Sequence, residues 1–234
     1  MTTANSQSPT AGAVASEVSG ALAAILAAAA SGRFPPADGT VSIVPQPSDR
    51  DAGVISFTAH AVVFADIDHA WLQAQLDPGD LSAPLSAAFL YALGERLGRR
   101  SHSVDMLMCA PTLPGPAPAD PALIELTDAA PEHPRIARAL RHRDAVRVWQ
   151  ADGGVVTIGR GVAGRCETSI EVDAAFRGRG LGAGLATAAR YLAPAGTPVW
   201  AQIAPANAAS VRAFLAAGFR PVGAEALLTR EAGS

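Results

Sequence analysis

The spacing of apolar residues predicts both strands and helices in the first 110 residues. Short runs of β-branched and aromatic residues are typical of strands, and apolar positions three or four residues apart indicate helices. The predicted elements are a helix over residues 13–33, strands over Thr40–Val44 and Gly53–Asp66, a helix that Asp66 or Asp68 caps and that runs to Leu76, a helix over Ala83–Leu97 that stops at Gly98, and a strand over Ser103–Cys109.

The second half of the chain has a more regular pattern. The dipeptide Asp152-Gly153 joins two apolar segments and predicts a hairpin with a two-residue turn. The expected elements are a strand over Leu123–Thr127, a helix over Pro134–Arg143, strands over Val146–Gln150, Gly154–Gly159 and Arg165–Asp173, a helix over Gly182–Leu192, a strand over Pro198–Ile203, a helix over Ala208–Ala217, and closing strands over Arg220–Gly223 and Ala226–Thr229.

A proline-rich run over residues 110–122 divides the chain and is typical of a linker. Charge changes across it: residues 1–119 carry 5 Arg and 10 acidic residues, whereas residues 120–234 carry 13 Arg and 11 acidic residues, which indicates different ligands for the two parts. We therefore predict a disordered tail and alanine-rich helix (1–37), an N-terminal αβ region (38–110), a linker (111–121) and a second domain (122–234).

The composition excludes several classes of function. The 234 residues are 49% hydrophobic and 17% charged, which fits a buried core and excludes disorder for most of the chain. The net charge is −3, so we expect no general nucleic-acid binding. All 18 basic residues are arginine, and the absence of lysine excludes Schiff-base enzymes, pyridoxal-phosphate enzymes, protein kinases and Walker-A nucleotide sites.

The cysteines and the apolar stretches bear on the compartment. Cys109 and Cys166 are too few for a disulfide framework or a zinc quartet, and the histidines lack the spacing of metal ligands, so we expect no metal. The stretch Ala21–Ala30 is too short to span a bilayer, and no basic segment precedes it. We therefore expect a cytoplasmic protein without membrane contact.

The segment from Ile170 to Gly182 carries the main chemical signal. A predicted strand ends there, glycines and arginines form a turn, and an amphipathic helix begins. Backbone N–H groups at a helix start have no partner within the helix, and the helix dipole adds about +0.5 charge. Glycine also lets a ligand approach the backbone closely. The segment therefore predicts an anion site for a pyrophosphate, with an ordinary glycine-rich turn and two solvated arginines as the alternative.

A second motif follows after one predicted strand, at Asn207-Ala-Ala-Ser210-Val-Arg-Ala-Phe214-Leu-Ala-Ala-Gly218-Phe219. Its local interpretation is a helix with Asn207 as the N-cap, Gly218 just after the C-terminus, and Phe219 as the apolar residue that packs back on the helix. That interpretation alone explains the two ends of the motif without any function.

Together the two motifs resemble those of the GNAT-type acyl-CoA N-acyltransferases. Arg177-x-x-Gly180-x-Gly182 resembles the pyrophosphate loop of that family, (Q/R)xxGx(G/A), and Asn207-x-x-Ser210-x-x-x-Phe214-x-x-x-Gly218-Phe219 is similar to the second signature. The order of strands around both motifs also matches, and the resemblance covers roughly residues 122–230. It implies an α/β (α+β) fold with a splayed, mixed β-sheet flanked by helices, to which the N-terminal αβ region is additional.

The resemblance also implies a binding mode for acetyl-CoA as the co-substrate. Acetyl-CoA would lie in the gap of the splayed sheet, with its pantetheine along the strand at Ile170 and Val172 and near Asn207. Ser210 and Phe214 would line the same channel. The residues expected to hold the pyrophosphate are Arg177, Gly178, Arg179, Gly180, Leu181 and Gly182.

The chain departs from the family at Phe214, where a tyrosine often protonates the departing thiolate. Glu167 and Glu171 lie four residues apart on one strand face and are candidates for accepting the proton of the amine, directly or through water. The alternative is an exposed strand face. We interpret Cys166 as a small buried residue and the arginines between 135 and 147 as a solvated helix face, or as one contact to the 3′-phosphate of CoA.

The sequence thus predicts an N-acyltransferase that moves an acyl group, expected to be acetyl, from acyl-CoA directly to the amine of a small molecule. Residues 38–110 would wall the acceptor side, where an acidic balance favours a cationic acceptor. Two alternatives stay open at this point: an acyltransferase for protein or peptide amines, and a CoA-binding interaction module with weak or no catalysis. A homodimer is a further possibility.

Overall fold

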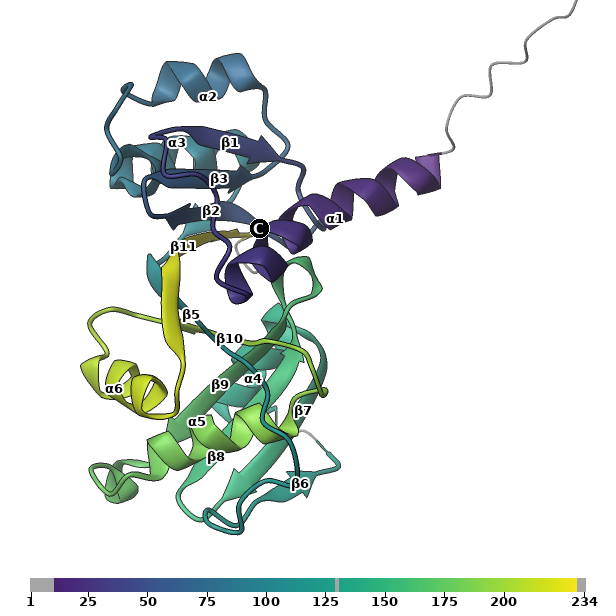
Figure 1. The fold of residues 1–234 in the computed structure, drawn as a ribbon, viewed down its shortest axis with the longest axis vertical. Helices are drawn as coiled ribbons and strands as arrows, with labels where there is room; N and C mark the ends of the chain where they lie inside the picture. Colours follow the sequence, from purple (N-terminus) through teal and green to yellow (C-terminus); the bar gives the residue numbers. More distant parts are fainter. Residues whose placement is uncertain (1–10, 129–130, 231–234) are drawn as a thin grey trace, which may run out of the picture.

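The computed structural model describes residues 11–128 and 131–230, and its strands form one mixed sheet. The strand order is β1-β3-β2-β11-β5-β10-β9-β8-β7-β6, with the short β4 paired to β11 (Figure 1). The pairs β1–β3 and β9–β10 are parallel, and the other pairs are antiparallel. The strands are β1 (Val41–Val44), β2 (Ala52–Phe57), β3 (His60–Phe64), β4 (Arg100–Ser101), β5 (Asp105–Ala110), β6 (Ile124–Leu126), β7 (Asp144–Ala151), β8 (Gly154–Arg160), β9 (Cys166–Val172), β10 (Val199–Ile203) and β11 (Arg220–Thr229).

Helices cover both faces of this sheet. Among the described residues they are α1 (Ala11–Ala30), α2 (His69–Gln75), α3 (Ala87–Leu97), α4 (Pro134–His142), α5 (Leu181–Leu192) and α6 (Ala208–Ala216). In Figure 1, α2 and α3 accompany β1–β3 at one end of the molecule, and α4, α5 and α6 accompany β7–β10 at the other. Of the helices that the structure describes, none combines the length and the apolar character that a membrane crossing requires.

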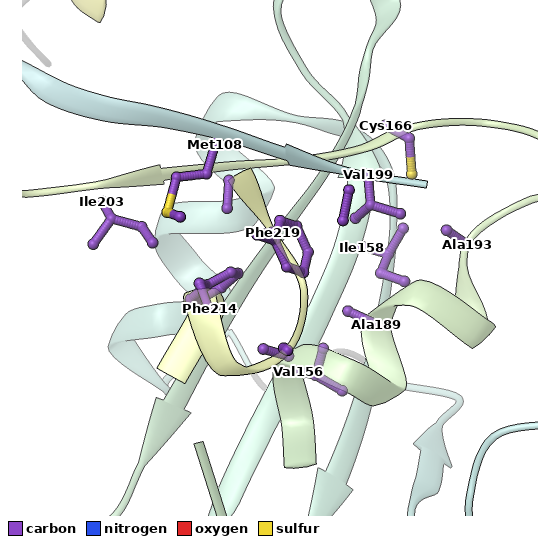
Figure 2. Packing of buried hydrophobic residues seen from close by; sticks show 14 of the residues in the cluster. Met108, Val156, Ile158, Cys166, Ala189, Ala193, Val199, Ile203, Phe214 and Phe219 are labelled. Carbon is purple, nitrogen blue, oxygen red and sulfur yellow. The ribbon is translucent and has the colours of Figure 1, made fainter. Parts of the chain in front are cut away.

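Buried apolar side chains join the helices to the sheet in three clusters. In the largest, Ala186 and Ala189 of α5 and Phe214 of α6 pack with Val156 and Ile158 of β8 (Figure 2). Small alanines let α5 lie close to the strands, so the helix start is held firmly beside the end of β9. The second cluster seats α1 on the sheet, and the third seats α2 and α3 against β2, β3 and β11.

Most predicted helix ends agree with the structure because caps are local. Asp68 caps α2, where its carboxylate accepts the N–H of Trp71 at 2.7 Å. Gly98 ends α3 in the left-handed conformation, with φ of 62°. The helix predicted over Ala83–Leu97 differs at its start: a 3₁₀ turn comes first, and Ser86 caps the α-helix.

Two strand predictions are wrong. The segment Gly53–Asp66 is not one strand but the hairpin of β2 and β3, which turns through Ala59 with φ of 50°. Neither glycine nor proline marks that turn, so the sequence carried no turn signal. The two predicted closing strands form one strand, β11, which accommodates Pro221 through a register shift between Pro221 and Gly223.

The sheet continues across the predicted linker. β5, from the N-terminal αβ region, pairs with β10 on one side and with β11 on the other. β11 in turn pairs with β2, so strands from both parts of the chain alternate in the middle of the sheet. The division of the chain into domains stays a prediction. The hydrogen-bonded sheet continues across the predicted domain boundaries.

The sheet splays between β9 and β10, and this opening positions the candidate site. The two strands pair only through Val199 with Cys166 and Trp200 with Glu167. Beyond this point, residues 168–172 of β9 have β8 as their strand partner and no partner on the β10 side within the described chain. A splayed, mixed sheet flanked by helices is the fold class that the sequence predicted, and the structure confirms it.

Candidate active site

The loop that follows β9 brings backbone donors to the head of α5. Gly178 and Gly180 adopt φ of 77° and 86°, a region that costs an L-residue roughly 1–2 kcal/mol. Gly180 is the N-cap of α5 and provides no side-chain cap. Within the part of the chain that the structure describes, the N–H groups of residues 178–182 have no hydrogen-bond acceptor. Such a run of N–H groups at a helix start fits an anion.

Of this run, residues 178 and 180–182 line a pocket of about 640 Å³, which we call the loop pocket. The unpaired end of β9 and residues of α6 also line this pocket, because the splay leaves β9 without a strand partner on that side. Two predicted binding residues, Arg179 and Phe214, do not line it. The predicted residues that line it are Ile170, Val172, Arg177, Gly178, Gly180, Leu181, Gly182, Asn207 and Ser210.

The second motif forms α6 as its caps predicted. The side chain of Asn207 accepts the N–H of Ser210 at 3.1 Å, and the N–H of Phe219 donates to the carbonyl of Phe214 at 3.0 Å after Gly218, with φ of 83°. Phe214 is 3% exposed and packs edge-on against Phe219, with ring centroids 4.9 Å apart (Figure 2). Asn207 and Phe214 thus have structural roles, whatever they bind.

A second pocket, which we call the arginine pocket, adjoins the loop pocket and also has a volume of about 640 Å³. Segments of both parts of the chain line it: the loop at Arg50, residues 102–105, α4, β9, β10 and the end of β11. Residues that line both pockets are Arg135, Ile170, Asn207 and Ser210. A ligand that runs along the end of β9 in the loop pocket would therefore point into the arginine pocket.

Glu167 lies in the arginine pocket but is 3% exposed and held by two guanidinium groups. It accepts Nε of Arg143 at 3.0 Å and Nε of Arg165 at 2.7 Å, and also the N–H of Val162. Burial alone would raise the pKa of this carboxyl, but the two positive charges outweigh it and lower the pKa of Glu167 below the usual glutamate range. Glu167 is therefore ionised at neutral pH and is a weak base.

Glu171 faces the same side of β9 but lies in the loop pocket, where its side chain is 36% exposed. Its carboxylate accepts Nε of Arg135 at 3.1 Å. The structure therefore places the two carboxylates on one strand face, as their spacing predicted, with a different arginine of the α4 region beside each. The expected solvated helix face is wrong for Arg143, whose side chain is 9% exposed and also binds Thr157 and Ser169.

A buried ion pair beside the splay is the part of the site that the sequence analysis missed. Arg165 donates to both oxygens of Glu225 at 2.9 and 2.7 Å, and Gln202 of β10 donates to the same carboxylate. These contacts tie the start of β9 to β11 and β10 next to Glu167. Because Arg165 and Glu225 lie 60 residues apart, no local spacing signals the pair.

Searches for relatives found likeness in fold but not in sequence. No family model matches the chain, and no curated protein matches it. Solved structures do match. A GCN5-related N-acetyltransferase from Kribbella flavida shows 17% identity and a TM-score of 0.40, and the matched region covers 62% of this chain and 64% of the Kribbella flavida chain. A putative acetyltransferase of the GNAT family from Novosphingobium aromaticivorans shows 23% identity and a TM-score of 0.38, and the match covers 58% of this chain and 69% of that chain.

A third structure, a GCN5-related N-acetyltransferase from Sphaerobacter thermophilus, shows 18% identity and a TM-score of 0.35, with 61% of this chain and 56% of that chain covered. The chain thus spans less than two thirds of the length of the Kribbella flavida and Sphaerobacter thermophilus proteins. All three solved structures are GNAT-type proteins, the family that the two sequence motifs resemble.

Proposed function

We propose that this protein is an N-acyltransferase that moves an acetyl group from acetyl-CoA to the amine of a small molecule. One observation carries the proposal: residues 178 and 180–182, whose N–H groups have no partner in the described chain, line the same pocket as the unpaired end of β9 and α6. An anion site and a free strand edge in one pocket suit a ligand that has a pyrophosphate followed by an amide-containing arm.

The proposed binding mode follows from these donors. The pyrophosphate accepts the N–H groups at the head of α5, and Arg177 and Arg179 lie next to them in the same loop. The pantetheine runs along β9 at Ile170 and Val172, where β10 has diverged. Asn207, Ser210 and Phe214 of α6 lie further along this path; the first two line both pockets, and Phe214 lines the arginine pocket. The thioester then lies where the two pockets meet.

In the proposed reaction the amine enters through the arginine pocket and attacks the thioester carbon. The new C–N bond forms, the C–S bond breaks, the amine loses a proton, and the thiolate of CoA leaves. Holding two reactants in this geometry supplies much of the acceleration for such a transfer. The pocket volume of about 640 Å³ is that of a small-molecule site, which supports a small acceptor rather than a protein chain.

We propose that Glu167 and Glu171 accept the proton of the amine through water. Glu167 lies in the pocket that we assign to the amine, but its low pKa weakens it as a direct base. We expect Glu167→Gln or Glu171→Gln to lower the rate and the loss to shrink as pH rises, because free amine accumulates. Wild-type rates in both variants from about pH 6 to pH 9 would contradict the relay.

A second candidate function, a CoA-binding module without catalysis, is favoured by one observation. Phe214 has no hydroxyl to protonate the thiolate, and neither Tyr91 nor Tyr191 lines either pocket in the described structure. Calorimetry with CoA and thiol release from acetyl-CoA with a panel of amines separate the candidates. Binding with amine-dependent release supports the enzyme, binding without release supports the module, and no binding at millimolar CoA contradicts both.

A further inference from the structure

The charge that lines the arginine pocket is strongly unequal. Its acidic lining residues in the described chain are Asp51, Asp105 and Glu167. The arginines that line it are Arg50, Arg135, Arg138, Arg141, Arg143 and Arg230. From this geometry, and resting on the proposed function, we infer that the acceptor carries an oxyanion, a carboxylate or a phosphate, in addition to its amine.

Three of these arginines, Arg138, Arg141 and Arg230, have no ion pair or side-chain hydrogen bond with any described residue, and the first two lie on α4. By contrast, Arg143 is committed to Glu167, Arg135 to Glu171, and Arg50 to Asp51 and Asp144. Arginine binds carboxylate and phosphate in a planar, two-pronged fashion, which suits it to this group of the acceptor.

His142 lies among the arginines of the pocket. Desolvation lowers the pKa of its imidazole, and the charges of Arg138, Arg141, Arg143 and Arg50 lower it further. Four guanidinium groups from two distant segments therefore act on one half-buried ring that lines the pocket. The part of this shift that comes from the arginines has the sign that favours an anion in a ligand, in agreement with the lining of the pocket.

The end of α4 does not by itself explain this cluster. Basic residues stabilise the C-terminus of a helix, and Arg141 and His142 occupy the last turn of α4. However, Arg50 and Arg230 reach the same pocket from the N-terminal region and from the end of β11. The result also reverses the expectation of a cationic acceptor, because the net charge of a region does not say which residues face a pocket.

The test compares amines that differ only in the anionic group. We would measure thiol release from acetyl-CoA with leucine against leucinamide, and with phosphoethanolamine against ethanolamine. Removing a carboxylate lowers the pKa of an adjacent amine and raises the fraction of free base, so intrinsic reactivity favours leucinamide. We expect the anionic member of at least one pair to have a kcat/KM at least tenfold higher. The two pairs distinguish a carboxylate from a phosphate.

Two variants assign any preference to the pocket. Arg138→Gln and Arg141→Gln are each expected to raise the KM of the preferred anionic amine about five- to tenfold and to change kcat little. The ratio of kcat/KM between the anionic and the neutral amine of that pair should therefore move towards one. The control is Arg220→Gln, since Arg220 is also exposed but lines neither pocket. It should leave every parameter unchanged.

Three results would overturn the inference. The first is equal kcat/KM, or a preference for the neutral amine, in both pairs. The second is a rise in the KM of acetyl-CoA instead of the acceptor in the arginine variants, which would assign the arginines to the 3′-phosphate of CoA. If no amine releases thiol, the proposed function fails separately, and calorimetry with the same pairs in the presence of CoA still measures the anionic preference. Equal affinities there are the third result.

Discussion

Arg165 connects three strands in the middle of the sheet through a buried guanidinium group. Its side chain is 3% exposed, and its guanidinium group binds Glu167 on one side and both oxygens of Glu225 on the other. It also lies over the ring of Trp200, 5.6 Å from the centroid. An arrangement of this kind is stable only when complete, because the loss of one partner leaves a buried charge unpaired.

We therefore expect Glu225→Ala to lower the free energy of unfolding by about 3–5 kcal/mol, since Arg165 loses its two-pronged partner. The control is Glu125→Ala, which removes the exposed pair with Arg147 and should cost about 0–1 kcal/mol. Urea unfolding measures both. Equal losses would mean that burial of the Arg165 pair has no special energetic weight.

Phe214→Tyr tests whether the missing hydroxyl limits the reaction. A thiol with a pKa near 8.5 is a tolerable leaving group at neutral pH, so positioning can suffice without a general acid. We expect the turnover rate to change by less than about tenfold, below the range of a full acid catalyst. Because Phe214 is buried against Phe219, a melting curve must accompany the kinetics. A hundredfold gain would instead show that the native enzyme lacks an acid.

The two cysteines should not react with thiol reagents in the folded protein. Burial raises the pKa of Cys109 to about 12 and that of Cys166 to about 11, so almost no thiolate forms at neutral pH. We expect no reaction with a disulfide reagent at pH 8 until urea unfolds the chain. A stoichiometric reaction in the native state would contradict this burial, and would also add a background to the thiol-release assay.

At the scale of single residues, the sequence predicted what local geometry determines. Asn207, Gly218 and Phe219 follow capping rules within one helix, and the structure confirms all three. Arg143 binds Glu167, 24 residues away, and Arg165 binds Glu225, 60 residues away, and only the assembled sheet brings these pairs together. The lowered pKa of Glu167 follows from its contacts with both Arg143 and Arg165, so its weakness as a base could not be predicted from its spacing to Glu171.

At the scale of elements, the conformation of Gly180 at the N-terminus of α5 determines whether the proposed pyrophosphate site can form. Gly180 needs a positive φ to turn the chain from β9 into the helix, and that turn exposes the N–H groups of the loop pocket. Turns of this kind are visible in sequence because glycine marks them. The β2–β3 hairpin was missed for the opposite reason, since Ala59 adopts φ of 50° without any glycine.

Gly180→Ala separates strain from binding when it is compared with Gly196→Ala. Both glycines have positive φ, 86° and 75°, and a Cβ at either would meet no atom within 4 Å. Each variant should lose roughly 1–2 kcal/mol of stability. Only Gly180→Ala should also weaken CoA binding, by at least about tenfold or 1.4 kcal/mol, because Gly196 lines neither pocket. Calorimetry measures the affinities, and equal affinities would contradict the proposed pyrophosphate site.

At the scale of the whole molecule, β5 and β11 join the two halves of the chain. β5 fills the position between β10 and β11, and β11 continues the sheet to β2. The helix and strand order of the C-terminal half was predictable because its neighbours in sequence are mostly neighbours in the sheet. The place of β5 was not, because its partners β10 and β11 are the last two strands of that half.

A fragment of residues 122–234 tests the predicted division into domains. Without β5, both β10 and β11 lose a hydrogen-bonded neighbour, and Met108, which belongs to the largest core cluster, is gone. We expect this fragment to be insoluble or to lack a cooperative melting transition, and a fragment of residues 105–234, which keeps β5 and Met108, to fold better. Circular dichroism and a thermal melt measure this. A cooperative melt of residues 122–234 would support the predicted boundaries.

The position of β5 also has a consequence for synthesis. β2 and β5 leave the ribosome with apolar faces and open edges, and their common partner β11 is made only after residues 111–219. At translation rates of about 5–20 residues per second this interval lasts roughly 5 to 20 seconds. Strand edges without a partner, such as the edge of β2 opposite β3, are prone to pair with other chains during such a delay. The nascent chain is therefore expected to depend on chaperones or slow concentration-sensitive steps, and its yield to fall when many copies are translated together.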